Sequence, residues 1–225
     1  MARQLVFDWP TGVALGAEDF FVSPANASAY AMIGEPALWP EGKLVLTGPE
    51  GAGKSHLARV FAARTGAAIC PATALPRDLH PSSGLVVEDL ETLPRAAEEA
   101  LFHLHNNLRA ARLPLLLTAR TPPARWPLTL PDLASRMQAC TVVPIAAPDD
   151  ALLRALVMKL FADRQVMPDA RVVDYLAARI ERSYRAAARV VAALDRAALE
   201  HRRPVTVALA RAVLEGDGEA PAGMS

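Results

Sequence analysis

The sequence predicts an α/β fold: a parallel β-sheet covered by helices on both faces, followed by a small all-helical unit. Short, almost continuously apolar runs alternate with segments of helical spacing up to Ile145, which is typical of strands buried on both faces. A glycine-rich loop joins one of these runs to a helix. Beyond Pro148 only helical spacing occurs, so the sheet is expected to end there.

The composition is that of an ordinary globular protein without bulk charge. The chain has 225 residues, of which 52% are hydrophobic and 21% charged, enough to form a core. Basic and acidic residues both number 24, so no bulk attraction to nucleic acid or an anionic membrane is indicated. Cys70 and Cys140 are too few for a disulfide framework or a zinc site and are interpreted as buried apolar residues. Because no signal peptide or membrane-spanning apolar run is found, we expect a soluble, cytoplasmic protein.

The N-terminal elements follow from local signals. Residues 1–20 lack helical periodicity, and their proline and glycines predict an extended arm followed by a loop. Ser23 followed by Pro24 is typical of a helix start, and Gly34 of its end. Apolar runs then predict strands at 44–47, 68–70, 85–87, 115–117 and 140–145, with helices at 56–64 and from about 94 to 111.

Four helices are predicted after the last strand. Asp149 or Asp150 can cap the first, the second follows Pro168, the third starts near Ser183, and Thr206 caps the fourth. Four short helices in succession indicate a small helical bundle.

The glycine-rich loop carries the strongest chemical signal. It matches G-x-x-x-x-G-K-[ST] without a mismatch and lies between a predicted strand and a predicted helix, the context that this phosphate-binding motif requires. Its backbone N–H groups and the helix N-terminus would hold the α- and β-phosphates of ADP or ATP alike; Lys54 would neutralise the β- and γ-phosphates, and Ser55 would bind Mg²⁺. The nucleotide-binding residues predicted here are Gly48, Gly51, Ala52, Gly53, Lys54, Ser55 and His56.

Two carboxylates follow the strand at 85–87. Either Glu88 or Asp89 is expected on the Mg²⁺ side, and the other can polarise the attacking water. An acidic strand end is also common where a buried strand reaches solvent, but its distance from the phosphate loop favours the catalytic interpretation. Thr118 ends the next apolar strand and could sense the γ-phosphate, although an ordinary strand-end threonine is nearly as good an interpretation.

These motifs together resemble the AAA+ module of the DnaA replication-initiator family. The resemblance covers most of the chain, including a segment similar to the family's stretch near the adenine and the start of the third C-terminal helix. The stretches that carry it are Lys54-Ser55-His56-Leu57, 85–89, 115–123, 130–136, 20–26 and Ser183-Tyr184-Arg185.

The resemblance implies roles for residues that the pattern alone would not single out. Phe21 and Val22 would lie near the adenine. Arg136 would be an arginine finger that acts on a nucleotide in a neighbouring subunit, and Arg185 a sensor-2 arginine that contacts phosphate within its own subunit. Both roles suit a planar, permanently charged group that binds phosphoryl oxygens bidentately. Without the family, each arginine would be interpreted as a solvated surface charge.

The chain departs from the initiators in two ways. It stops shortly after the fourth helix, where they continue into a DNA-binding domain, so we expect that domain to be missing, as in the Hda-type regulators that inactivate DnaA. Glu88 stands where the family usually has aspartate, and its longer side chain could displace Mg²⁺ and impair intrinsic hydrolysis.

The N-terminal arm contains a hexapeptide similar to the sliding-clamp-binding motif of Hda-type proteins. Its motif residues are Gln4, Leu5, Phe7 and Trp9, at positions one, two, four and six of the hexapeptide. In an extended arm the last three share one side and could fill an apolar groove, while the amide binds its rim. The alternative is that they pack on the protein's own core. The expected segments are an arm with the clamp motif (1–19), a nucleotide-binding AAA+ core (20–147), a helical lid (148–216) and a flexible tail (217–225).

The leading hypothesis is an Hda-like negative regulator of replication initiation. It would bind ADP or ATP with Mg²⁺, dock on the DNA-loaded sliding clamp, and present Arg136 to ATP bound by DnaA, with weak or no ATPase activity of its own. Homo-oligomers are possible, and any DNA contact would be weak or indirect. The alternatives are an autonomous ATPase of the helicase-loader type, which Glu88, Asp89 and Thr118 would serve, and a nucleotide-gated clamp adaptor without a catalytic contribution.

Overall fold

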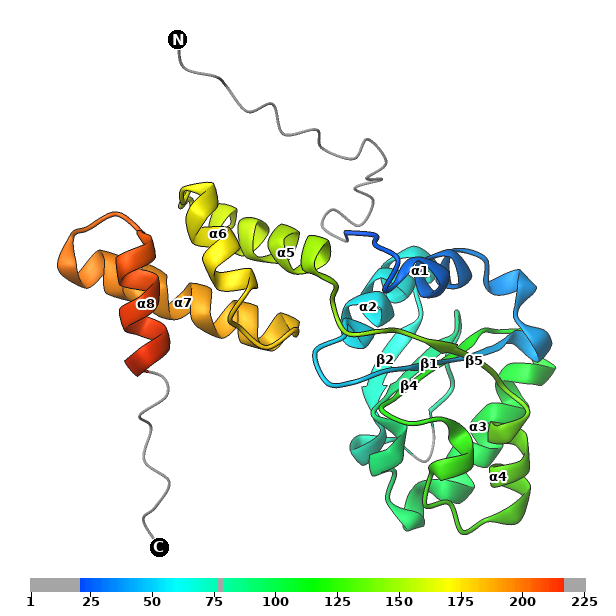
Figure 1. The fold of residues 1–225 in the computed structure, drawn as a ribbon. Coiled ribbons are helices and arrows are strands. Elements are labelled where there is room, and N and C mark those ends of the chain that lie inside the picture. The colour runs from blue at the N-terminus through cyan, green and yellow to red at the C-terminus, as the bar shows by residue number, and fades with distance from the viewer. Residues whose placement is uncertain (1–20, 77–78, 217–225) are drawn as a thin grey trace, which may run out of the picture.

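A five-stranded parallel sheet forms the centre of the N-terminal part of the chain (Figure 1). The computed structural model describes residues 21–76 and 79–216. The strands are β1 (Lys43–Thr47), β2 (Ala68–Pro71), β3 (Leu85–Glu88), β4 (Leu115–Ala119) and β5 (Thr141–Pro144). They lie in the order β2-β3-β4-β1-β5, so β1 has β4 on one side and β5 on the other. The predicted α/β class with a parallel sheet is confirmed.

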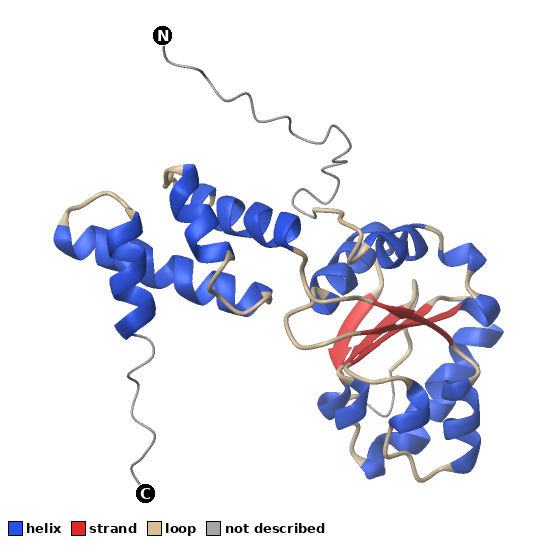
Figure 2. Cartoon of the chain, viewed as in Figure 1, coloured by secondary structure: helices blue, strands red, loops and turns tan. Residues whose placement is uncertain are grey.

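Helices cover both faces of this sheet (Figure 2). Side chains alternate along a strand, so Leu44 and Leu46 of β1 pack on one face with α1 (Ala27–Gly34) and α2 (Lys54–Thr65). Val45 packs on the other face with α3 (Glu98–Ala110) and α4 (Pro131–Gln138). β1 and β4 are buried along their whole length, whereas the edge strands β2 and β5 are largely exposed. Near-continuous apolar sequence therefore marks the inner strands best.

Two helices start later than the sequence indicates. Ser23 and Pro24 belong to a turn, in which the Ser23 N–H donates to Asn26 Oδ1 (2.9 Å) and the Ala27 N–H donates to Ser23 O (2.9 Å), and α1 begins only after it. A short 3₁₀ turn at Arg95–Ala97 precedes α3. Before α1, local hydrogen bonds of Ser23 and Asn26 compete with helix formation.

Up to residue 216, the last one described, the C-terminal part consists of four helices with a hydrophobic cluster of their own. They are α5 (Asp150–Ala162), α6 (Ala170–Ala177), α7 (Tyr184–His201) and α8 (Val207–Gly216). Each begins next to a capping side chain that accepts a hydrogen bond from the first turn; the caps are Asp149, Asp169, Ser183 and Thr206. The sequence predicts the caps at Asp149 and Thr206 and the start near Ser183, whereas the cap at Asp169 is seen only in the structure. Within the described ranges, no helix is long and apolar enough to cross a membrane.

The two cysteines are free thiols, but only one of them is fully buried. Cys140 lies in the core, as expected. Cys70 is half-buried because it belongs to the edge strand β2, where one side of the strand has no neighbour. Burial nevertheless raises the pKa of both thiols to about 11, so neither is a thiolate at neutral pH.

His105 on α3 makes stability depend on pH. It is fully buried, and burial together with the nearby charge of Lys43 lowers its pKa to about 4. In the unfolded chain this pKa returns to about 6.5, so between these values the unfolded state binds more protons and stability falls as pH falls.

Between pH 7 and pH 5, protonation of His105 in the unfolded chain should lower the unfolding free energy of the wild type by about 2 kcal/mol. His105→Leu should not show this part of the loss, and urea unfolding at both pH values measures it. Exposed His103 on the same helix is the matched control, and equal pH slopes for His105→Leu and the wild type would contradict the assignment.

Candidate nucleotide-binding site

The glycine-rich loop lies at the carboxyl edge of the sheet, between β1 and α2. The Gly48 N–H donates to Ala119 O of β4 (3.3 Å), and the Ile145 N–H after β5 donates to Thr47 O (2.6 Å). The start of the loop is thus held by the strands on both sides. A Cβ atom at Gly48 would overlap the carbonyl oxygen of Ile145, so only glycine fits there.

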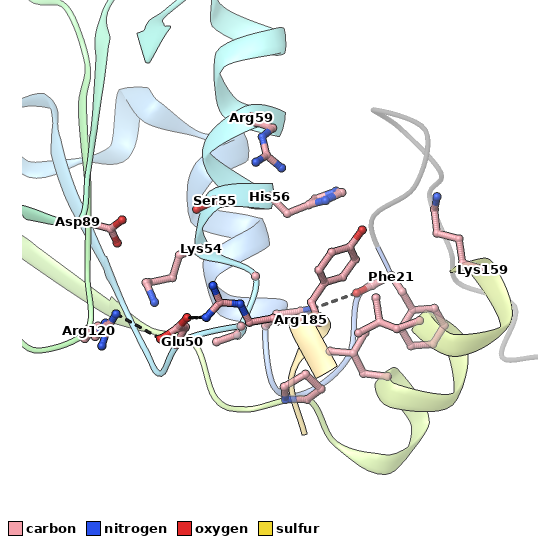
Figure 3. Close-up of a pocket in the computed structure, with 18 residues that line it drawn as sticks. Phe21, Glu50, Lys54, Ser55, His56, Arg59, Asp89, Arg120, Lys159 and Arg185 are labelled. Atoms are coloured by element: carbon pink, nitrogen blue, oxygen red, sulfur yellow. Dashed lines mark hydrogen bonds and ion pairs between the residues drawn. The ribbon is translucent and has the colours of Figure 1, made fainter. Parts of the chain in front are cut away.

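A cavity of about 540 Å³ opens beside this loop (Figure 3). Four of its charged side chains, Lys54, Glu50, Asp89 and Arg120, gather toward one end, and Phe21 lies toward the other. The remaining lining includes the apolar side chains Pro148, Leu152 and Leu156. The arrangement suits a ligand with an anionic end and an apolar, ring-like end.

Lys54 is the buried cation of the site. Its side chain is shielded by the loop, and Nζ donates to the carbonyl oxygens of Gly48 (2.7 Å) and Pro49 (2.9 Å). Burial lowers its pKa, while the negative charges of Asp89 and Glu91 act in the opposite direction. The loop therefore holds the ammonium group at its own centre, where a phosphate chain would lie in a motif of this type.

The two carboxylates after β3 differ in position. Asp89 lines the cavity with a left-handed backbone (φ 55°), and its N–H donates to Thr118 Oγ1 (3.1 Å). Glu88 does not line the cavity, and its buried Oε1 has no hydrogen-bond partner among the described residues. Thr118 is also buried, and its hydroxyl holds the backbone of Asp89 through this hydrogen bond. Of the three, Asp89 is the one that faces Lys54 (Figure 3), and roles for Glu88 and Thr118 remain predictions.

The donor set fits the Mg²⁺ ion that the resemblance implies. Ser55 and Asp89 line the same cavity, and a hydroxyl and a carboxylate are the oxygen ligands that Mg²⁺ prefers. Across residues 21–76 and 79–216, no group of three or more His, Cys, Asp and Glu side chains could hold a metal alone. Mg²⁺ here would therefore depend on phosphate oxygens, as is usual for nucleotide sites.

The first residues of α7 contact the glycine-rich loop and close the cavity from the helical side. The Tyr184 N–H donates to Gly51 O (3.1 Å), and Arg185 forms an ion pair with Glu50. Ser183, the cap of α7, is buried against Gly51. Loop and helical part are therefore joined at the cavity itself.

Gly51 is expected to be irreplaceable for this contact. It has a φ of +76°, and a Cβ atom would lie 2.5 Å from Ser183 Cβ, whereas Gly53 (φ +102°) has nothing within 4 Å of an added Cβ. Gly51→Ala should lower the free energy of unfolding by about 1–3 kcal/mol through backbone strain, and by a further amount because α7 must move away. Gly53→Ala should lower it only through backbone strain. Urea unfolding of both variants without nucleotide measures the difference, and an equal cost would contradict a tight loop–helix contact.

Several lining residues have no role assigned from the sequence. Arg120 Nη2 forms an ion pair with Glu50 Oε2 (3.2 Å), and the Arg120 backbone N–H donates to Glu91 Oε1 (3.0 Å). A signal for Arg120 exists, because it follows Thr118 at the carboxyl end of β4, the strand next to β1. The other polar or charged ones, which lie on several different elements, are Asn26, Glu50, Arg59, Lys159 and Tyr184, and the apolar ones are Pro148, Leu152 and Leu156.

The segment before α1 brings one of its two predicted residues to the cavity. Phe21 lines it, and Asn26 fixes the backbone there by donating from Nδ2 to Phe21 O (3.0 Å). The Ala146 N–H donates to Ala25 O (3.0 Å), which ties this segment to the chain just after β5. Val22 packs against the core beside α1 and α2 instead.

Two predicted sites do not contribute to the cavity as described: Arg136 lies away from it, and the clamp motif falls outside the described residues. Arg136 is half-buried on α4, with its guanidinium carbon 4.8 Å from the centre of the Phe102 ring. It does not line the cavity of its own chain. Gln4, Leu5, Phe7 and Trp9 fall in the part of the chain that the structure does not describe.

A phosphate loop after the first strand, a parallel sheet with β1 beside β4, and a helical part against the cavity define an AAA+ module. The fold is similar to domain III of the replication initiation protein DnaA from Thermotoga maritima (TM-score 0.75, 17% identity, 91% of this chain and 96% of that chain). It is also similar to AMPPCP-bound DnaA from Aquifex aeolicus (0.64, 19%, 81% and 68%). The Holliday junction branch migration motor RuvB from T. maritima is a further neighbour (0.61, 18%, 77% and 61%). No model of a known protein family matches the sequence. The protein thus has a DnaA-like AAA+ fold.

Proposed function

We propose that the protein binds ADP or ATP with Mg²⁺ and acts as an Hda-like negative regulator of replication initiation. The observation that carries the nucleotide part is the convergence of Lys54, Ser55, Asp89 and Arg185 on one cavity at the glycine-rich loop. The DnaA neighbour with the same fold is bound to AMPPCP, which supports a nucleotide as the ligand.

In this proposal each side chain has a separate task. The backbone N–H groups of the loop and the N-terminus of α2 bind the phosphate chain, and Lys54 neutralises its charge. Ser55 and Asp89 hold the Mg²⁺ ion that the phosphates bring. Phe21 and the apolar residues of α5 enclose the base. Arg185 couples nucleotide binding to the position of the helical lid, because it is at the start of α7.

The regulatory part rests on Arg136. It lies on α4, outside its own cavity, with a guanidinium group that is stacked on Phe102 and half-exposed. An arginine in that position has no nucleotide of its own chain to act on. It is suited to a nucleotide held by another AAA+ module, which we take to be ATP bound by DnaA.

An autonomous ATPase of the helicase-loader type is the second candidate. The observation that favours it is Asp89, which faces Lys54 at the same end of the cavity and could serve hydrolysis on this chain. ATP turnover by this protein alone, by DnaA alone and by the two together separates the candidates. We expect ATP turnover by the two proteins together, with DNA-loaded clamp, to exceed the sum of their separate turnovers. Turnover by this protein alone, stimulated by single-stranded DNA, would favour the helicase-loader candidate, and clamp binding with unchanged DnaA turnover would favour a plain adaptor.

Docking on the sliding clamp is assigned to the arm. Gln4→Ala should abolish recovery of this protein with immobilised clamp, because the amide that binds the rim of the groove is lost. Nucleotide binding should be unaffected and serves as the control for folding. Recovery at the level of the wild type would exclude the arm as the clamp-binding segment.

A further inference from the structure

Glu50 of the glycine-rich loop lies between two arginines that come from opposite sides of the cavity. One carboxylate oxygen contacts Arg120 Nη2 (3.2 Å), which belongs to the sheet side, and the other contacts Arg185 Nη1 on α7. Figure 3 shows the carboxylate between the two guanidinium groups, beside Lys54. Glu50 and Arg185 are 135 positions apart, so a single acidic side chain joins the core to the helical lid.

These contacts use the same groups that a phosphate chain would need. A guanidinium group binds carboxylate and phosphate with the same N–H fork, so the two anions compete for it. All three side chains line the cavity together with the loop and Lys54. Arg120 is also held by Glu91, through its backbone N–H (3.0 Å) and Nε (3.7 Å), which keeps its guanidinium at the cavity.

We propose that Arg120 is a further phosphate-binding residue and that Glu50 competes with the phosphate chain for Arg120 and Arg185. The proposal rests on the nucleotide site proposed above. In it, Glu50 lowers the affinity of the site for nucleotide, and the effect grows with the charge of the phosphate chain. When nucleotide binds, contacts of Arg120 and Arg185 with phosphate replace their contacts with the Glu50 carboxylate, so that phosphate then links the core to the lid.

Titration calorimetry with ADP and with AMPPCP, each with Mg²⁺, tests the proposal. Glu50→Gln removes the charge but keeps the shape, and should tighten binding of AMPPCP about fivefold to tenfold and of ADP by less. Arg120→Gln should weaken both, AMPPCP by about tenfold. In the Glu50→Gln, Arg120→Gln double variant, the gain from the first change should shrink to about twofold, because only Arg185 is left to compete for.

Asp174→Asn is the matched control for a loss of one negative charge. Asp174 is exposed, pairs with Arg154 on the lid and does not line the cavity, so nucleotide affinity should stay within about twofold of the wild type.

The outcomes separate this proposal from the nucleotide site itself. If the wild type binds nucleotide but Glu50→Gln leaves the affinity unchanged or lowers it, the competition is overturned. Wild-type affinity in Arg120→Gln would overturn the new phosphate contact, and full additivity in the double variant would overturn the link between Glu50 and Arg120. If neither the wild type nor any variant binds nucleotide, the proposed function fails and this proposal fails with it.

Discussion

Replacement of Lys54 by methionine is expected to lower the affinity for ADP and ATP by at least about 100-fold. Methionine matches the length of the lysine stem but cannot donate charge-assisted hydrogen bonds, each of which contributes about 1.5–3 kcal/mol, and a tenfold change corresponds to about 1.4 kcal/mol. The ammonium group is buried at the centre of the loop, so no neighbouring side chain can take its place.

Lys159 provides the control, because it also lines the cavity but lies toward the end at Phe21 and pairs with Asp163. Lys159→Met should change the affinity by less than about threefold. Calorimetric titration measures both variants, and thermal unfolding without nucleotide checks that each is folded. Unchanged binding by a folded Lys54→Met variant would mean that the loop is not a phosphate site.

Replacement of Arg136 by alanine is expected to remove the stimulation of ATP hydrolysis by DnaA. Arginines that reach a nucleotide from a neighbouring module contribute about 10³ to 10⁵ in rate, so little stimulation should survive. Arg136→Lys should restore little of it, because an ammonium group lacks the planar fork. Nucleotide and clamp binding should remain, since Arg136 lines no part of the cavity.

Arg125 is a suitable control because it is an exposed arginine between β4 and α4, not part of the cavity lining. Its replacement by alanine should leave the stimulation intact. Hydrolysis by DnaA is followed with labelled ATP in the presence of DNA-loaded clamp. Full stimulation by the Arg136→Ala variant would refute the arginine-finger role.

The class of fold and the position of the loop could be predicted because they depend on local sequence. Apolar runs such as Leu115–Leu117 identify the inner strands, and the spacing of glycines and Lys54 needs no knowledge of distant residues. Helix starts were less predictable: Ser23 can cap a helix or form a turn, and its contact with Asn26 decides for the turn.

The composition of the site was predictable only in part. Glu88 and Asp89 are equivalent in sequence, but the left-handed backbone at Asp89 turns it into the cavity while Glu88 remains in the strand. The contact of Glu50 with Arg185 spans 135 positions, and nothing in local sequence indicates which of the 21 arginines would meet that carboxylate. Contacts of this kind depend on how the lid is placed against the loop.

We infer that a nucleotide binds between the glycine-rich loop and the start of α7. Hydrogen–deuterium exchange of the wild type, with and without ADP and Mg²⁺, tests it most directly, because slower exchange marks backbone amides that become protected. We expect protection in residues 48–56 and, at the same time, in residues 183–189, with little change in α4. Protection of the loop without protection of α7, or of neither segment at saturating nucleotide, would contradict the claim.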